Sequence, residues 1–172
     1  MTDQQITTQQ QYLTFAVCDD DYAVPILRVK EIIAFDSVTR VPRTPSFIRG
    51  VINLRGSVVP VIDLAQKFGY PESRTTRSSC IVIVEMALDD KPIVLGVLVD
   101  AVNQVVDLLD EDIQEPPSFG TRVDIGFLVG MGRAGKKFVL ILDIDKVLAA
   151  SDVIAAADAA APAEDLAGES AA

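Results

Sequence analysis

The chain has 172 residues, 49% of them hydrophobic, and its 15 basic and 25 acidic residues give a formal net charge of −10. This composition predicts a folded globular protein, and no apolar run reaches the roughly 18 residues that a membrane-spanning helix requires. The sequence contains no histidine, which argues against histidine-based catalysis and most transition-metal sites, and its acidity makes nucleic acid and anionic membranes poor partners.

The N-terminal part predicts a flexible lead followed by two strands. Residues 1–11 are polar and contain no Lys or Arg, so no signal peptide is expected there. The protein is therefore expected to be cytoplasmic. Residues 12–17 are β-rich, and the acidic triplet Asp19–Asp21 predicts the turn into the next strand. Residues 26–33 fit a short helical turn or an irregular strand, because apolar side chains recur without a clean period of two.

The rest of the chain predicts hairpins and short helices. Two β-rich runs within residues 51–64 flank Arg55-Gly56-Ser57, which is hairpin chemistry. Further strands or hairpins are expected at 80–86, 92–99 and 126–144, with short helices at 65–68 and from Asp145 onward. Residues 151–172 are rich in alanine and acidic side chains, contain no basic residue and predict a loose tail.

The folded part contains an internal repeat. Phe47-Ile48-x-Gly50 matches Phe127-Leu128-x-Gly130 at an offset of 80 residues, as residues 61–64 match 141–144. Further upstream, residues 24–33 match 97–106 at an offset of 73. The repeat predicts a mostly β domain over residues 12–150, built from two small barrel halves at about 12–70 and 80–150 with a groove between them.

One pattern in the sequence resembles a dinucleotide-binding loop. Residues 130–135 read Gly-Met-Gly-Arg-Ala-Gly, a formal G-x-G-x-x-G. A nucleotide site needs this loop to open a helix, whereas a β-rich run follows it here, so a glycine-rich hairpin is predicted and no cofactor is expected. Asp63 and Asp143 stand at equivalent strand ends and are predicted to cap the next helical turn. No enzymatic site is predicted.

Arg55 is the residue with the strongest case for binding. An exposed arginine at a hairpin tip is often only a solvated charge. Beside a glycine on a rigid turn, however, its guanidinium offers several donors that a partner can approach closely. Glu31 is the natural acidic counterpart in the same half of the sequence.

Residues 47–64 resemble the CheW family of chemotaxis coupling proteins. The segment Phe47-Ile-Arg-Gly-Val-Ile-Asn-Leu-Arg-Gly56 runs into Val58-Val-Pro-Val-Ile-Asp-Leu64, and the loop at residues 39–45 and the run at 96–100 also fit the family's order and spacing. The resemblance implies two SH3-like barrel halves with short helices and no catalysis. It implies a cytoplasmic adaptor that is recruited to membrane receptor arrays, where it binds the cytoplasmic tip of methyl-accepting chemoreceptors and the regulatory domain of a CheA-like histidine kinase.

The resemblance also assigns interface residues. The receptor-facing or supporting positions would be Val29, Glu31, Arg55, Gly96, Val102 and Val105, and the kinase side would include Arg49, Gly50 and Val58. A related chemosensory pathway, with pili or another output, is an alternative within the same reading. A small barrel that binds oligonucleotides is an alternative from another class, but it predicts a basic groove with exposed aromatics, and this acidic chain has only 6% aromatic residues.

Overall fold

A computed structural model describes residues 9–88, 90–115 and 125–149, together with residues 152, 155, 156 and 158. Its elements in chain order are β2 (Gln9–Val17), β3 (Asp20–Pro25), η1 (Ile26–Arg28), β4 (Val29–Ala34), β5 (Ile48–Leu54), β6 (Ser57–Asp63), α1 (Leu64–Lys67), β7 (Cys80–Leu88), β8 (Lys91–Val99), β9 (Ala101–Leu109), η2 (Asp110–Asp112), η3 (Ile125–Phe127), β10 (Leu128–Ala134), β11 (Lys137–Leu142) and α2 (Ile144–Val147). None of the helices in this described part is long and apolar enough to cross a bilayer.

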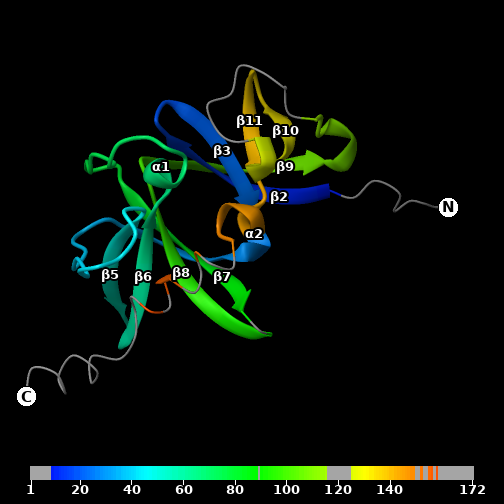
Figure 1. Ribbon diagram of the computed structural model, residues 1–172. Helices are drawn as coiled ribbons and strands as arrows, with labels where there is room; N and C mark the ends of the chain where they lie inside the picture. The colour runs from blue at the N-terminus through cyan, green and yellow to red at the C-terminus, as the bar shows by residue number, and fades with distance from the viewer. Residues whose placement is uncertain are drawn as a thin grey trace, which may run out of the picture.

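The strands form two five-stranded sheets, each curled into a small barrel. The first, barrel A, has the order β10-β11-β3-β2-β9, and the second, barrel B, has the order β4-β7-β8-β6-β5. Single bridges, Gln114 to Met131 in barrel A and Thr39 to Val51 in barrel B, join the chain beyond one edge strand to the opposite edge. Barrel A lies above barrel B in Figure 1. The prediction of a mostly β fold with two SH3-like halves and short helices is confirmed.

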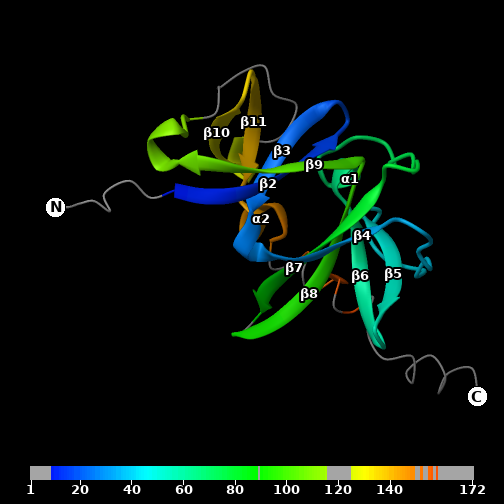
Figure 2. The same ribbon diagram turned by 180° about the vertical axis from the view of Figure 1, so that it is seen from behind.

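The two barrels do not coincide with the expected halves at 12–70 and 80–150. Barrel A takes β2 and β3 from the first half and three strands from the second, while barrel B takes three strands from the first half and β7 and β8 from the second. The reason is that the chain crosses between barrels in the middle of each half. Figure 2 shows the first crossing, where the chain leaves β3 through η1 and enters β4.

The repeat extends to the irregularities of the strands. Bulges lie between Ile48 and Gly50 and between Leu128 and Gly130, which are 80 residues apart. The strand pair β4–β7 is bulged between Val29 and Glu31, and β2–β9 is bulged at the corresponding place in β9, between Val102 and Gln104. Equivalent parallel pairs join β6 to β8 and β11 to β3. Both halves therefore follow the same backbone plan and exchange strands.

Three apolar clusters hold the fold together. Barrel A encloses Tyr12, Ala23, Leu108, Val139 and Ile141. Barrel B encloses Val59, Val61, Ile81, Ile83 and Leu98. The third and largest cluster is shared, because it combines side chains of β2, β3 and β11 with side chains of β6, β7, β8 and α1. This shared core fixes the two barrels against each other.

The folded part extends further at both ends than the sequence predicted. The strand β2 begins at Gln9, inside the lead predicted at 1–11. At the other end, Asp152 and Ala156 are buried, and Asp152 Oδ2 lies 2.7 Å from Lys67 Nζ. The first part of the predicted tail thus packs on the body. Residues 1–8 and 159–172 lie outside the described residues.

The glycine-rich pattern and the two aspartates behave as predicted. Residues 130–135 run along β10 into its turn with β11, so they form a hairpin and open no helix. Asp63 accepts hydrogen bonds from the backbone N–H groups of Ala65 and Gln66 at the start of α1. Asp143 accepts the equivalent pair from Asp145 and Lys146 at the start of α2.

Candidate protein-interaction surface

Arg55 and Glu31, both predicted as interface residues, form an ion pair on barrel B. Arg55 Nη1 lies 2.5 Å from Glu31 Oε1, and Arg55 Nη2 lies 3.1 Å from Glu31 Oε2, so the contact is bidentate. The Arg55 side chain is 76% exposed, whereas that of Glu31 is 25% exposed. The carboxylate is therefore largely covered, while the guanidinium presents its other N–H groups to a partner.

The backbone of the β5–β6 turn sets the position of Arg55. Arg55 and Gly56 have φ angles of 53° and 89°, which is the pattern of a two-residue hairpin turn with both central residues left-handed. The side chain of Asn53 accepts a hydrogen bond from Gly56 N and supports the turn. A left-handed arginine costs on the order of 1 kcal/mol of backbone strain, and such positions are enriched at functional sites.

The other residues assigned to the receptor side are distributed over both barrels. Val29 and Val102 begin equivalent bulged segments, and both pack partly buried against the shared core. Val105 is 47% exposed on β9. Gly96 differs from these residues because it is buried within β8, where an added Cβ would lie 2.7 Å from Ile81 Cγ2. Gly96 thus lines no surface, and any influence on binding is exerted through packing.

The residues assigned to the kinase side fall into two groups. Val58, at the start of β6, is 49% exposed and is available for contact. Arg49, by contrast, is largely buried and bonds through Nη1 to the fully buried Asp63 carboxylate at 3.1 Å and to Ser73 O at 3.1 Å. Gly50 is buried with φ at 150°, and a Cβ there would lie 2.2 Å from the Thr39 carbonyl oxygen. Arg49 and Gly50 shape this side of barrel B from within.

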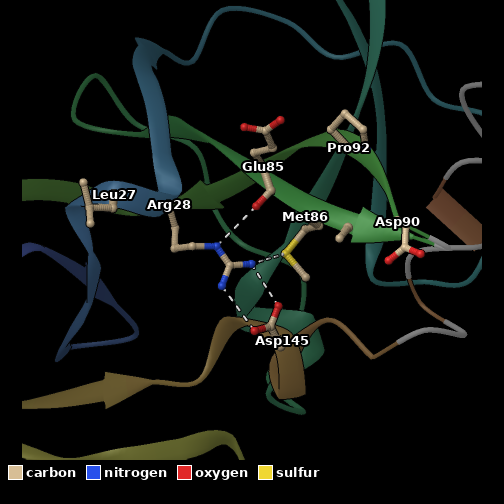
Figure 3. Close-up of a pocket in the computed structure, with 8 residues that line it drawn as sticks. Leu27, Arg28, Glu85, Met86, Asp90, Pro92 and Asp145 are labelled. Atoms are coloured by element: carbon tan, nitrogen blue, oxygen red, sulfur yellow. Dashed lines mark hydrogen bonds and ion pairs between the residues drawn. The ribbon is translucent and has the colours of Figure 1, made fainter.

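The structure adds a site that the sequence did not reveal, at the junction of the barrels. A cavity of about 460 Å³ opens beside η1 and is lined in part by Leu27, Arg28, Met86 and Asp145. As Figure 3 shows, the Arg28 guanidinium reaches α2 and β7 at the same time. It donates to both carboxylate oxygens of Asp145 at 2.9 and 3.2 Å, to Glu85 O at 3.3 Å and to Met86 Sδ at 3.3 Å.

This contact changes the titration of both partners. The hydrogen bond from Arg28 lowers the pKa of the Asp145 carboxyl, and the same bond raises the pKa of Arg28. Arg28 thus joins the crossing segment to one element of each barrel. No sequence signal could have found the pair, because its members are 117 residues apart.

The described residues offer no alternative centre for metal chemistry. Among them, no group of three or more Cys, Asp or Glu side chains is placed to hold a metal ion. The acidic triplet Asp19–Asp21 belongs to the β2–β3 turn and the start of β3, as predicted. The described surface carries exposed apolar side chains and two bidentate ion pairs, Arg55 with Glu31 and Arg28 with Asp145.

Comparison with known proteins identifies the family of this chain. The family model described as the CheW-like domain matches residues 11–152. The chain is 34% identical over 147 residues to the chemotaxis protein CheW of Klebsiella aerogenes, covering 86% of each chain. It is also 32% identical over 147 residues to the protein FrzA of Myxococcus xanthus, covering 84% of this chain and 88% of that protein.

A solved structure agrees with the sequence relatives. The crystal structure of the scaffolding protein TtCheW from Thermoanaerobacter tengcongensis matches with a TM-score of 0.69 and 33% sequence identity, covering 79% of this chain and 90% of that one. The match to the family model extends across both barrels and both crossings between them. The chain therefore belongs to the CheW family.

Proposed function

We propose that this chain is a non-catalytic cytoplasmic adaptor that couples chemoreceptors to a CheA-like histidine kinase. The observation that carries the proposal is the bidentate pair between Arg55 and Glu31, which stands on the surface of a CheW-family fold at the positions where the resemblance implies receptor contact. The same coupling role would serve a pathway with another output, such as pili. Membership of the CheW family favours an adaptor over an oligonucleotide-binding barrel.

The two partners would use different surfaces, the receptor side drawing on both barrels and the kinase side on barrel B alone. The receptor side would comprise Glu31 and Arg55 with the apolar side chains of Val29, Val102 and Val105. The kinase side would present Val58, supported from within by Arg49 and Gly50. Exposure separates contacting residues from supporting ones within this division, since Val58 and Arg55 are accessible while Arg49 is occupied by Asp63.

The test is a double-mutant cycle on Arg55→Glu and Glu31→Arg. A surface pair of this kind stabilises a fold by only about 0–1 kcal/mol, so neither change should shift the melting temperature appreciably. Charge reversal in an interface can cost roughly 2–5 kcal/mol, so Arg55→Glu should lose receptor-dependent kinase activation while it still binds the kinase. Combining the two changes should restore part of the activation, because the pair is re-formed in reverse.

Each outcome of the cycle has a clear meaning. Strict additivity of the two changes would show that the pair does not act as a unit in coupling. Full receptor-dependent activation by Arg55→Glu alone would remove this face from the receptor site. Loss of folding, checked by circular dichroism, would contradict the small stability effect expected of an exposed pair.

A further inference from the structure

Barrel B has a small surface cavity whose lining differs in chemistry from that of the equivalent cavity in barrel A. We call it mouth B. It has a volume of about 240 Å³ and is lined by Lys30, Glu31, Leu54, Arg55, Ser57, Val59, Ile83 and Val94. The floor is apolar, with Val59 and Ile83 almost fully buried in the core of the barrel. The rim is charged, because it includes Lys30 and the pair of Glu31 and Arg55.

Barrel A has the same cavity at the equivalent repeat positions, here called mouth A. It measures about 250 Å³ and is lined by Thr14, Asp21, Asn103, Gln104, Ala134, Lys137 and Val139. Asn103 and Gln104 follow Lys30 and Glu31 by 73 residues, while Ala134, Lys137 and Val139 follow Leu54, Ser57 and Val59 by 80. The strand registers likewise place Thr14 at the position of Ile83 and Asp21 at that of Val94.

Mouth A is polar, and its groups satisfy one another. Thr14 Oγ1 donates to Gln104 O at 2.8 Å and lies 3.1 Å from Gln104 N. Asn103 Nδ2 donates to Asp21 Oδ1 at 3.3 Å, and Lys137 Nζ lies 4.0 Å from Asp21 Oδ2. The backbone plan therefore accepts a polar lining at this place. Of the two floor residues of mouth B, Val59 has an apolar counterpart in Val139, whereas Ile83 is replaced by Thr14. A floor that is apolar throughout is therefore not required by the fold.

The exposed charge on the rim of mouth B is positive. Glu31 is mostly covered, and both of its oxygens are bonded to Arg55, whereas the guanidinium is open to solvent. The Lys30 side chain is 49% exposed, and the Glu85 carboxylate, which does not line the cavity, lies 4.0 Å from Lys30 Nζ. This cationic rim stands on a chain whose net charge is −10. The position equivalent to Arg55 is Gly135, which adopts its φ of 65° without a side-chain penalty. Barrel B thus carries a strained arginine where its counterpart has an unstrained turn.

We propose that mouth B is a socket that receives one apolar side chain of the receptor segment, beside a receptor carboxylate that binds Arg55 and Lys30. The apolar floor supplies the contact area, and the cationic rim selects an acidic neighbour. This inference deepens the proposed function and rests on it. It assigns the pair of Arg55 and Glu31 a specific task, which is to orient the guanidinium at the edge of an apolar pocket.

The test covers each mouth with the same bulky side chain. Ser57 and Lys137 are exposed, equivalent residues at the starts of β6 and β11, so Ser57→Phe and Lys137→Phe form a matched pair. The probe is the purified cytoplasmic signalling fragment of a chemoreceptor from the same organism, titrated by calorimetry onto the full chain. Ser57→Phe should weaken binding at least about tenfold, and Lys137→Phe should leave it within about twofold.

A second pair of variants tests the charge selection. Lys30→Glu should weaken binding and reduce its dependence on salt, whereas Asn103→Glu at the equivalent position of mouth A should do neither. Methyl NMR provides the site readout, because the resonances of Leu54, Val59 and Val94 should shift on binding while that of Val139 should not.

The outcomes separate the socket from the function on which it rests. If the unaltered chain binds the receptor fragment and Ser57→Phe binds it equally well, the socket is wrong and the adaptor function stands. Equal losses in Ser57→Phe and Lys137→Phe would also overturn the socket, because the two mouths would then not differ. If the unaltered chain binds no receptor fragment, the proposed function and the socket both fail.

Discussion

The loop-and-helix ends of the two barrels show how far a duplicated backbone can diverge in its side chains. In both, an aspartate caps a short helix, and its backbone N–H donates to the carbonyl of the equivalent phenylalanine, Phe47 or Phe127. In barrel B, Asp63 is fully buried and also binds Arg49 and Ser73. In barrel A, Asp143 is half-buried, and the position of Arg49 is taken by Val129, which is 55% exposed.

The difference separates what the fold requires from what one barrel has added. The cap is present in both barrels because every helix start leaves backbone N–H groups without partners. The buried carboxylate with its arginine is present only in barrel B, where Glu72 and Arg40 extend it to the surface loop at residues 71–79. The added network thus rigidifies the side of barrel B on which the kinase contact is expected.

Removing the helix caps Asp63 and Asp143 should give the largest difference in unfolding free energy between equivalent positions of the two barrels. Asp63→Ala leaves the mostly buried Arg49 with the half-exposed Glu72 as its remaining carboxylate partner, removes the helix cap, and should lower the free energy of unfolding by about 3 kcal/mol. Asp143→Ala removes a cap alone and should cost about 1 kcal/mol. Urea denaturation measures both.

Asparagine variants sharpen this contrast. Asparagine still caps a helix, so Asp143→Asn should be nearly neutral. Asp63→Asn should still lose most of the unfolding free energy that Asp63→Ala loses. Equal losses at the two positions would mean that the network around Asp63 adds nothing beyond the cap.

An intermediate effect is expected at Gly96, whose equivalent in barrel A is Ala23. Gly96→Ala places a Cβ 2.7 Å from Ile81 Cγ2, and such overpacking typically costs about 1–3 kcal/mol. Thermal denaturation measures the loss. Receptor affinity, measured well below the melting temperature, should remain unchanged because Gly96 is buried. A gain in stability, as an alanine in place of a strand glycine often gives, would contradict the packing argument.

The smallest effect is expected where the chain crosses between the barrels. Arg28 occupies one crossing, and the equivalent position in the other is Ala101. The hydrogen bond from Arg28 lowers the folded-state pKa of Asp145 below the ordinary value of 3.8, so the pairing stabilises the protein above that pH and the contribution is lost as pH falls through the lower folded value. The Asp145 side chain is well exposed, so Asp145→Asn should cost only about 0.5 kcal/mol at neutral pH.

The pH dependence provides the check on this crossing. The difference in unfolding free energy between the unaltered chain and Asp145→Asn should shrink as the pH is lowered below about 4, where the unfolded carboxyl already binds a proton. A difference that stays constant down to the acid transition would assign the effect to packing and not to the ion pair with Arg28.

The sequence predicted the local elements well and the long-range pairing poorly. The hairpin at Arg55-Gly56, the caps at Asp63 and Asp143 and the strand character of the glycine pattern depend on nearby residues, so short-range chemistry was sufficient. Strand β9 was not predicted as a separate strand, because its polar and apolar residues do not alternate cleanly.

Long-range features required the coordinates. The exchange of strands between barrels could not be read from the repeat, since a contiguous and an exchanged arrangement share the same sequence pattern. The pair of Glu31 and Arg55 was anticipated from charge and from the family resemblance, and the structure brings its two members together. The junction pair of Arg28 and Asp145 and the burial of Arg49 depend on tertiary contacts that no motif encodes.

The exchange of strands has a consequence for how the protein is made. The strands of barrel B are complete once Val99 has been synthesised, whereas β2 and β3 must wait for β9, which begins at Ala101. At about 5–20 residues per second, the interval from Pro25 to Ala101 corresponds to roughly 4–15 s on the ribosome. An isolated two-stranded hairpin is marginally stable in water. We therefore expect barrel B to fold first and to serve as the surface on which the waiting β2–β3 hairpin and the last strands assemble.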